Sequence, residues 1–210
     1  MDRFIERFYD PVTGDARTCG TTASLCGIEK GGYEGDPAQV SLGIQRVLMM
    51  HAAMMSMAGF PMLSSGDEIG HVNGYGYHDD PVLREDSRNL HRTPFHWDNA
   101  ALRDQPGTVQ QRFWDGLHQL ETLRALEPCF GPEAVVTTWD THNLHVLALV
   151  RRVGGEKLVC LANFSGQEQT VVLDDMEGVF TDLITGKETL CSSLRLPPYQ
   201  YAWCRSKGVH

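Results

Sequence analysis

Three features that define common functional classes are missing from this sequence. No apolar run approaches the roughly 20 residues that a membrane-spanning helix requires. Basic residues are few: 18 Lys and Arg stand against 27 Asp and Glu, and the formal net charge of -9 argues against a nucleic-acid-binding surface. The opening residues, MDRFIERFYD, hold no apolar stretch typical of a secretory signal. We therefore expect a protein that binds neither nucleic acid nor a membrane.

Metal-binding and redox motifs are also missing. The six cysteines contain no CxxC pair, and a chain of 210 residues does not need disulfide bonds to stabilise its core. His78, Asp79 and Asp80 are of the types that bind metals, but they do not provide three ligands at a spacing typical of metal sites. We expect free thiols in a reducing compartment, the cytoplasm, and neither a metal nor another cofactor.

The strongest positive pattern is a helix that begins at Pro37, with Asp36 placed to cap it. Apolar residues then recur at intervals of three and four, until Gly59 and Pro61 end the helix. The apolar run Phe60–Leu63 is too short for a helix and predicts a buried strand. A helix followed by a buried strand is typical of one αβ unit of a parallel sheet.

Two carboxylates, Asp67 and Glu68, follow the predicted strand and lie between glycines. Ligands of α/β proteins are bound at the carboxyl ends of strands, so this position is of interest. Neighbouring residues at a strand end point in opposite directions, however, and do not easily flank one bond. We therefore expect these carboxylates to form hydrogen bonds at the rim and to cap a helix, not to be a catalytic pair.

The segments on either side of this unit are less regular. We expect one or two helical turns in Asp2–Phe8, a short helix in Thr21–Leu25 and a polar connector in Glu29–Asp36. The polar segment His71–Asp98 is rich in aromatic and ionisable residues, which indicates a functional loop and not a disordered one. A second amphipathic helix is predicted from about Thr108 to Leu126.

From Cys129 onward the apolar residues alternate with a period of two. Short strands at regular spacing are typical of an antiparallel β-sandwich, and Gly154-Gly155 predicts a hairpin turn between two of them. The predicted strands are Ala134–Trp139, Leu144–Arg152, Lys157–Phe164, Gln169–Leu173, Val179–Leu183, Glu188–Leu190 and Tyr199–Cys204.

The order of these motifs resembles a known family. Gly66-Asp67-Glu68 after the predicted strand, Asp86-Ser87-Arg88 and His91-Arg92 in the polar loop, a last helix and a small β-sandwich resemble the C-terminal end of α-amylase-family glycoside hydrolases. Within that family the sequence is most similar to amylosucrases, because Pro11–Arg17 resembles a loop of their extra subdomain and Leu196–Gln200 resembles their closing strand. The Gly-Asp-Glu element is common to many members, whereas the Pro11–Arg17 loop together with Asp86-Ser87-Arg88 is more specific.

The resemblance implies a fold of class α/β plus all-β. Residues 1–36 would be the remnant of an inserted subdomain, and residues 37–128 the last αβα part of a TIM (β/α)8 catalytic barrel. Residues 129–210 would form the C-terminal β-sandwich domain. The implied activity is that of a retaining transglucosidase that uses sucrose to build α-glucan and releases fructose.

The resemblance also implies how this chain takes part in the reaction. Arg88 is similar to the arginine at the floor of the sucrose pocket, where it would pair with an aspartate from an earlier strand. Arg17 is similar to an acceptor-side arginine that would contact the fructosyl ring or the incoming glucan. The nucleophile and the acid–base would lie on segments outside this chain, so the isolated chain is expected to be inactive. Its partners would be sucrose, α-glucan and the missing N-terminal part of the enzyme.

Several alternatives stay open. The segment Arg92–Asp98 is more similar to the Arg-Thr-Pro-x-x-Trp-Asp loop of α-glucosidases and sucrose-isomerising relatives, so the parent enzyme is a sucrose hydrolase or an α-glucosidase in a second interpretation. In a third, the chain is a non-catalytic module that binds carbohydrate or complements another chain. Arg88 can instead form a surface salt bridge with Asp86 or Glu85, and Tyr75 and Tyr77 either stack on sugars or cap the packing.

Overall fold

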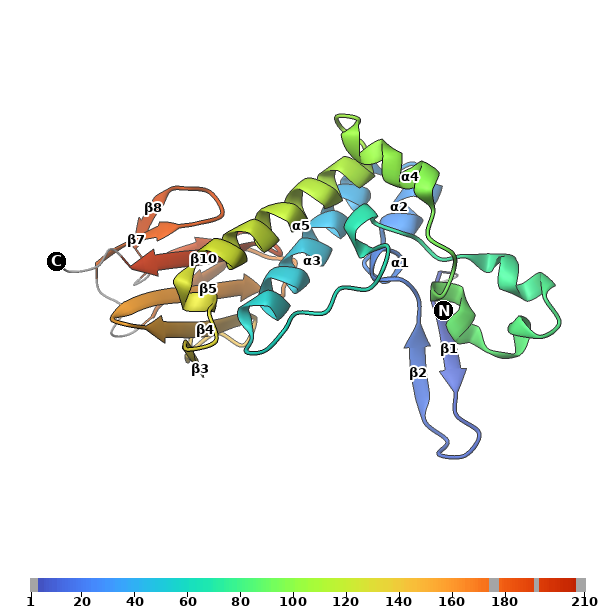
Figure 1. The fold of residues 1–210 in the computed structure, drawn as a ribbon, viewed down its shortest axis with the longest axis horizontal. Helices are drawn as coiled ribbons and strands as arrows, with labels where there is room; N and C mark the ends of the chain where they lie inside the picture. The colour runs from blue at the N-terminus through green and yellow to red at the C-terminus, as the bar shows by residue number, and fades with distance from the viewer. Residues whose placement is uncertain (1–3, 174–177, 191–192, 207–210) are drawn as a thin grey trace. The chain divides into compact units, whose positions relative to one another are not determined.

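The structure is a computed structural model that describes residues 4–173, 178–190 and 193–206. It divides into two compact units (Figure 1). Unit 1 comprises Met1–Val47 and Leu63–Asp115, and unit 2 comprises Leu48–Met62 and Gly116–His210. These units cut through both long helices, whereas the domains predicted from the sequence end at residues 36 and 128. The predicted domain boundaries stay a prediction.

The described residues contain five α-helices, six short 3₁₀ turns and ten strands. The helices are α1 (Thr22–Leu25), α2 (Ile28–Glu34), α3 (Pro37–Ser56), α4 (Trp97–Ala101) and α5 (Val109–Leu126). The strands are β1 (Glu6–Tyr9), β2 (Ala16–Cys19), β3 (Val135–Thr138), β4 (Val146–Val153), β5 (Glu156–Asn163), β6 (Gln169–Val171), β7 (Val179–Asp182), β8 (Glu188–Leu190), β9 (Leu194–Leu196) and β10 (Tyr201–Ser206). No described helix is both long enough and apolar enough to cross a membrane.

The two long helices confirm the prediction from apolar periodicity. At the start of α3 the Asp36 Oδ1 atom accepts hydrogen bonds from the backbone N–H groups of Ala38 (2.9 Å) and Gln39 (3.0 Å), so the predicted cap is also confirmed. At the start of α5 the hydroxyl of Thr108 accepts the N–H of Gln111 at 3.1 Å. Both caps satisfy backbone donors that would otherwise have no partner in the first helical turn.

The predicted buried strand at Phe60–Leu63 is wrong. These residues form no strand, and Phe60 and Met62 are 97% and 81% exposed. A strand requires a hydrogen-bonded neighbour, and within the described residues every paired strand is antiparallel and none pairs with this segment. The side chains of Phe60 and Met62 are therefore left exposed. Asp67 and Glu68, in turn, lie on a 3₁₀ turn, η1 (Asp67–Ile69).

Two predictions for the N-terminal residues are also wrong. Residues 1–3 lie outside the described part of the chain, but Glu6–Tyr9 form strand β1 instead of helical turns, and pair with β2 so that Phe8 lies opposite Arg17. The segment predicted as a polar connector contains helix α2, which is bounded by Gly27 and Gly35 with φ of 90° and 68°. Only glycine adopts such left-handed angles at low cost, and this allows two sharp helix ends in a short segment. The predicted short helix is confirmed by α1.

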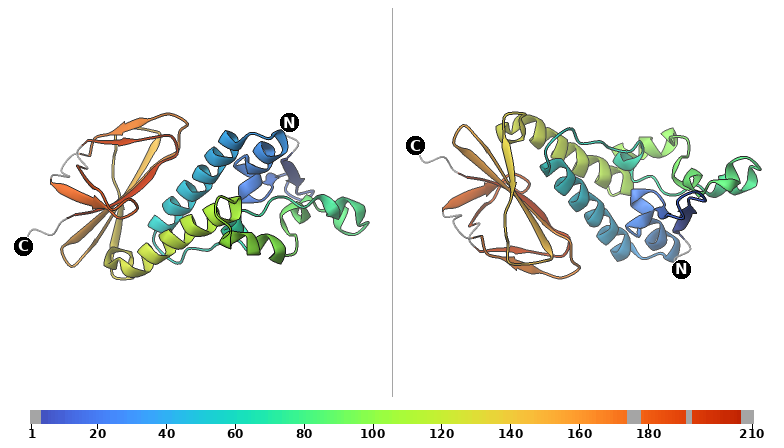
Figure 2. Two further views of the ribbon diagram at one scale, coloured as in Figure 1. Left: turned by 90° about the horizontal axis from the view of Figure 1, so that it is seen from above. Right: turned by 90° about the horizontal axis from the view of Figure 1, so that it is seen from below.

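The antiparallel β-sandwich is confirmed in unit 2. One sheet has the strand order β3-β4-β5-β10-β7-β8, and the second pairs β6 with β9. Figure 2 shows these strands, coloured from yellow to red, from two opposite sides. The core between the sheets contains Val150, Val159 and Phe180 from the large sheet and Val171 and Leu196 from the small one. Strand β9 was missed, because its three residues alternate too briefly to give a pattern.

Details of the sandwich also agree with the sequence. Val153 pairs with Glu156 across the Gly154-Gly155 turn, whose φ values of 54° and 89° suit a tight hairpin. The five cysteines in the described residues are buried and form no disulfide bond, which agrees with the predicted thiols, and Cys191 lies outside them. Burial raises the pKa of the Cys26 and Cys129 thiols to about 11 and that of Cys160 to about 12, so these thiols stay protonated near neutral pH.

Candidate functional site

The predicted functional loop packs against the β1–β2 hairpin in unit 1. The loop is a series of 3₁₀ turns, η2 (Tyr75–Asp79), η3 (Leu83–Glu85) and η4 (Ser87–His91). Cys19 of β2, Tyr77 of η2 and Leu90 of η4 are buried together, with Phe8 of β1 packed against them. We call these four residues the hairpin cluster. Because two segments about 70 residues apart share one small core, side chains of both can act at one site.

Asn73 ties this region together and was not predicted from the sequence. Its Oδ1 accepts the N–H of Thr21 at 2.8 Å, its Nδ2 donates to the carbonyl of Phe4 at 2.8 Å, and its own N–H donates to Ser24 Oγ at 3.0 Å. The side chain is buried. Nothing in the local sequence around Asn73 indicates partners 49 to 69 residues away.

Arg88 has its carboxylate partner two residues away. Its Nε donates to Asp86 Oδ1 and Oδ2 at 2.8 and 3.0 Å, and its Nη2 donates to Oδ2 at 2.6 Å. The guanidinium carbon also lies 4.3 Å from the centre of the Phe8 ring. These bonds form the salt bridge to Asp86 that the sequence analysis left open as an alternative. The predicted binding role of Arg88 stays a prediction.

Arg17 lies on β2, directly opposite Phe8 of β1. Directly opposed residues of an antiparallel pair share one face of the sheet, about 5 Å apart at their Cβ atoms. The Arg17 side chain is 74% exposed and forms an ion pair with Asp15 at 3.2 Å. The structure therefore places Arg17 on the face of the hairpin that carries Phe8, whose ring also lies beside Arg88. The role of Arg17 at the acceptor stays a prediction.

Tyr77 takes the packing role left open by the sequence. Its hydroxyl donates to the Glu6 carboxylate, and both burial and this carboxylate raise the pKa of Tyr77 well above its usual value. His78 Nε2 lies 3.2 Å from the other oxygen of Glu6. No group of three potential metal ligands occurs among the described residues. Tyr75 stays partly exposed.

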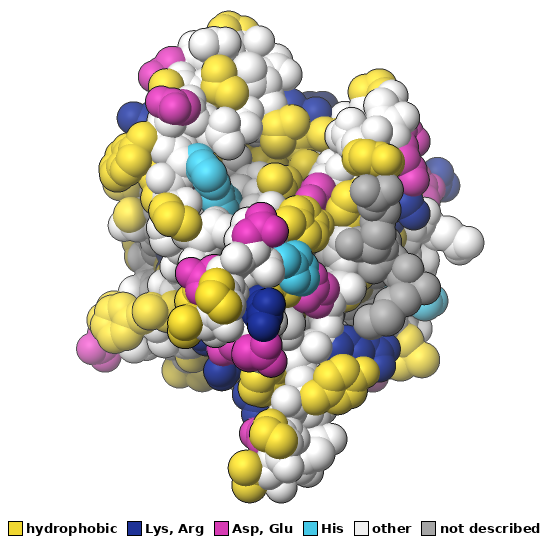
Figure 3. Space-filling model, turned by 90° about the vertical axis from the view of Figure 1, so that its right-hand side faces the viewer, with side chains coloured by type: hydrophobic (Ala, Val, Ile, Leu, Met, Phe, Trp, Pro, Cys, Tyr) yellow, Lys and Arg dark blue, Asp and Glu magenta, His cyan; other side chains and the backbone are white. Residues whose placement is uncertain are grey.

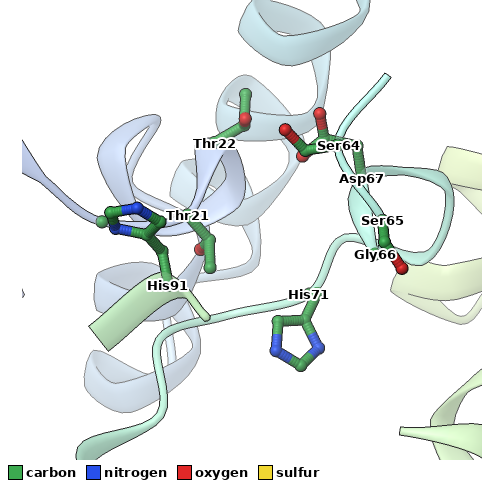
Figure 4. A pocket seen from close by; sticks show the side chains of 9 residues that line it. Thr21, Thr22, Ser64, Ser65, Gly66, Asp67, His71 and His91 are labelled. Carbon is green, nitrogen blue, oxygen red and sulfur yellow. The ribbon is translucent and has the colours of Figure 1, made fainter. Parts of the chain in front are cut away.

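A small pocket lies beside this cluster (Figure 4). Hydroxyl, imidazole and carboxylate groups, which can bind the hydroxyls of a sugar, line it. The lining residues are Gly20, Thr21, Thr22, Ser64, Ser65, Gly66, Asp67, His71 and His91. His91 and Arg88 are three residues apart on η4, and side chains at this spacing eclipse each other on a 3₁₀ turn. The pocket therefore adjoins the face of η4 that carries Arg88.

The two histidines of the pocket stay neutral more easily than free histidine. Burial, and then the stacked ring of His96 at 4.9 Å, lower the pKa of His71, whose Nε2 also bonds the Thr93 hydroxyl. Burial, and then Arg92, lower the pKa of His91. Glu68 accepts the N–H of Gly66 at 2.8 Å, which agrees with a structural role for that carboxylate. Figure 3 shows acidic, basic and hydrophobic side chains interspersed on the side of the molecule that carries the hairpin.

The close approach of Gly74 to Thr93 predicts a specific steric effect. A Cβ atom on Gly74 would lie 2.0 Å from Thr93 Cγ2, whereas one on Gly76 would meet nothing within 4 Å. We expect Gly74→Ala to lower the free energy of unfolding by about 1–3 kcal/mol, and Gly76→Ala to change it by less than about 0.5 kcal/mol. Urea denaturation of both variants measures this. Equal effects of the two substitutions would contradict the packing described.

The Asp86–Arg88 pair predicts a titration. Hydrogen bonds from the Arg88 side chain and backbone lower the pKa of Asp86 to about 2. This carboxylate therefore contributes stability above its unfolded pKa near 4, and that contribution is lost as the pH falls from about 4 to about 2. In Arg88→Ala the midpoint of Asp86 is expected to rise toward about 4. The control variant Arg84→Ala leaves the Asp86 carboxyl untouched, so a shifted midpoint in that variant, measured by NMR titration, would count against the pair.

Comparison with known proteins agrees with this architecture. Residues 136–203, which hold most of the β-sandwich, match the maltogenic amylase C-terminal domain. The β-sandwich is thus similar to the C-terminal β domain of α-amylase-family enzymes.

Solved structures show the same fold in longer α-amylase-family chains. AmyP in complex with maltose matches with a TM-score of 0.64 and 21% identity, over 77% of this chain and 34% of that chain. The trehalulose synthase MutB from Pseudomonas mesoacidophila MX-45 matches with a TM-score of 0.59 and 20% identity, over 78% and 38%. A MutB mutant, E254Q, is in complex with its substrate sucrose. This chain thus spans little more than a third of the length of these relatives.

Proposed function

We propose that this chain is the C-terminal portion of an amylosucrase-like retaining transglucosidase, which transfers glucose from sucrose to α-glucan and releases fructose in the cytoplasm. The chain provides the substrate-binding arginines Arg88 and Arg17. In this proposal α3 and α5 belong to the end of a (β/α)8 barrel, and the β1–β2 hairpin to an inserted subdomain. Retention requires two carboxyl groups about 5 Å apart across the scissile bond. In this proposal both of them, the nucleophile and the acid–base, are contributed by other segments.

The position of Arg88 beside the Phe8 ring, on the hairpin face that also holds Arg17, carries this proposal. Arginine is always charged and donates hydrogen bonds in a fixed fork, which suits the hydroxyls of a sugar. Asp86 occupies one edge of the Arg88 fork, so the side chain is oriented before a ligand arrives. The adjoining pocket adds hydroxyl and imidazole groups. Together these groups form a polar site that fits a neutral polyhydroxyl ligand.

A second candidate, sucrose isomerisation or α-glucoside hydrolysis, is favoured by the segment Arg92–Asp98. Thr93 binds His71, His96 stacks on His71, and the rings of Phe95 and Trp97 meet edge to face at 4.7 Å. This ordered segment thus borders the pocket through His71. Its similarity to sucrose-isomerising enzymes agrees with the fold shared with trehalulose synthase.

Product analysis separates these candidates. We would join this chain to a barrel segment that carries the catalytic carboxylates, confirm folding by circular dichroism and supply sucrose. Fructose release with glucan growth is the expected result. Equal glucose and fructose would indicate a hydrolase, and an isomeric disaccharide an isomerase. Carbohydrate binding without turnover would indicate a non-catalytic module and would refute the proposal. The isolated 210-residue chain should release no sugar above a blank.

A further inference from the structure

We infer that Phe8 is a positioning residue for Arg88: its ring fixes the plane of the guanidinium so that the Nη1 edge faces the ligand. This inference rests on the proposed function for the identity of the ligand, a sugar hydroxyl, but its geometry stands alone. Phe8 belongs to none of the motifs that the sequence singled out.

The guanidinium of Arg88 is held on two sides. Its Nε and Nη2 atoms make three contacts of 2.6–3.0 Å with the Asp86 carboxylate, and the Phe8 ring covers one face of the plane at 4.3 Å. Among the described residues Nη1 makes no hydrogen bond to the protein. Both N–H groups of Nη1 therefore stay available as donors, and the side chain is still 43% exposed. A ligand can reach this edge without breaking the pair with Asp86.

The contacts of Arg88 with Asp86 and with Phe8 constrain the guanidinium in different ways. The carboxylate orients one edge of the fork, but a partly exposed pair of this kind is weak and does not by itself fix the plane of the guanidinium. A ring stacked on the guanidinium adds a second constraint, because the attraction depends on the face of the ring. Phe8 can supply it because Cys19, Tyr77 and Leu90 hold the ring in the hairpin cluster. Arg17, opposite Phe8 on β2, lies on the same face of the hairpin.

NMR of the 210-residue chain without any sugar tests this inference. Rotation about the Nε–Cζ bond of Arg88 exchanges its two Nη atoms, and the rate reports how firmly the plane is held. We expect Phe8→Leu to raise this rate by roughly tenfold, as a lost cation–π contact would. Phe8→Tyr, which keeps a ring, should restore the rate to within about twofold. Tyr9→Leu is the control, because Tyr9 is 64% exposed and alternates to the other face of β1.

The outcomes are distinct. An unchanged rate in Phe8→Leu, or an equal rise in Tyr9→Leu, overturns the inference. Phe8→Met, a second aliphatic replacement, decides the matter if the leucine variant does not give the wild-type circular dichroism spectrum. The NMR experiment uses no sugar, so its result holds even if product analysis shows that the enzyme does not act on sucrose. Conversely, an unchanged exchange rate would refute the role of Phe8 but not the proposed function, which product analysis tests.

Discussion

Arg151→Met is expected to lower the free energy of unfolding of unit 2 by about 3 kcal/mol or more. The side chain is 2% exposed, and its bonds all go to backbone carbonyls: Nε donates to Cys129 at 2.6 Å, and Nη1 donates to Ser56 at 3.0 Å and Met57 at 3.1 Å. Methionine fills the space of the stem but has no donor. The buried carbonyls of Cys129 and Ser56 and the partly buried carbonyl of Met57 would lose this donor, and each loss at a buried carbonyl costs about 1–3 kcal/mol.

The neighbouring residue provides a matched control. Arg152 follows on the same strand, donates to the Thr137 hydroxyl at 3.2 Å and lies over the Trp139 ring at 5.5 Å, with solvent access. Arg152→Met should cost less than about 1 kcal/mol. Urea unfolding followed by circular dichroism measures both. If the two variants lose stability equally, the buried bonds of Arg151 do not hold unit 2 together.

The size of this effect follows from what happens at the end of α3. Helices end with carbonyls that have no partner, and cations stabilise that end. Arg151 binds the carbonyls of Ser56 and Met57, and Arg124 donates to the carbonyls of Met55 (2.5 Å) and Gly59 (2.9 Å). Trp203 of β10 adds a bond from Nε1 to Ser56 Oγ at 3.1 Å. Arginines of α5 and β4 thus bind the carbonyls at and just beyond the C-terminal end of α3.

The parts of the fold that could be predicted are those with a long periodic signal. Helices α3 and α5 have 20 and 18 residues, so several turns repeat the same apolar spacing, and Asp36 and Thr108 mark their starts. The strands around Gly154-Gly155 have eight residues each. By contrast, β1 and β2 have four residues each, which is too short for a periodic signal, and their side chains pack against Leu90 of η4. The prediction for Phe60–Leu63 is wrong for the opposite reason: the local pattern is typical of a strand, but no strand among the described residues pairs with it.

The candidate site shows the same limit. Arg88 and Asp86 are two residues apart, so their pairing was a reading that the sequence itself offered. The contact of Arg88 with Phe8 joins residues 80 positions apart, and the hydrogen bonds of Asn73 join residues 49 to 69 positions apart. Such contacts depend on how the hairpin folds back on η4, and no local pattern records that.

Arg88→Ala is expected to reduce kcat/KM for sucrose by a factor on the order of 10² to 10³, in the polypeptide that joins this chain to the catalytic barrel segment. The substitution removes the donors of the fork and leaves Asp86 as an unpaired negative charge beside the ligand. The lost donors weaken binding in both the ground state and the transition state, and the charge repels the oxygen atoms of the sugar. Arg17→Ala should mainly change the ratio of hydrolysis to chain elongation, because its proposed contact is with the acceptor.

The decisive measurement is kcat/KM for sucrose in Arg88→Ala beside Arg84→Ala. Arg84 lies in the same loop and has the same charge, but its ion pair with Glu85 at 3.3 Å is exposed on both sides. The proposed site predicts a loss of about 10²-fold or more for Arg88→Ala and a change of less than about twofold for Arg84→Ala. Near-normal kinetics of Arg88→Ala, or an equal loss in both variants, would show that Arg88 is a surface residue and would contradict the proposed role of this chain in binding sucrose.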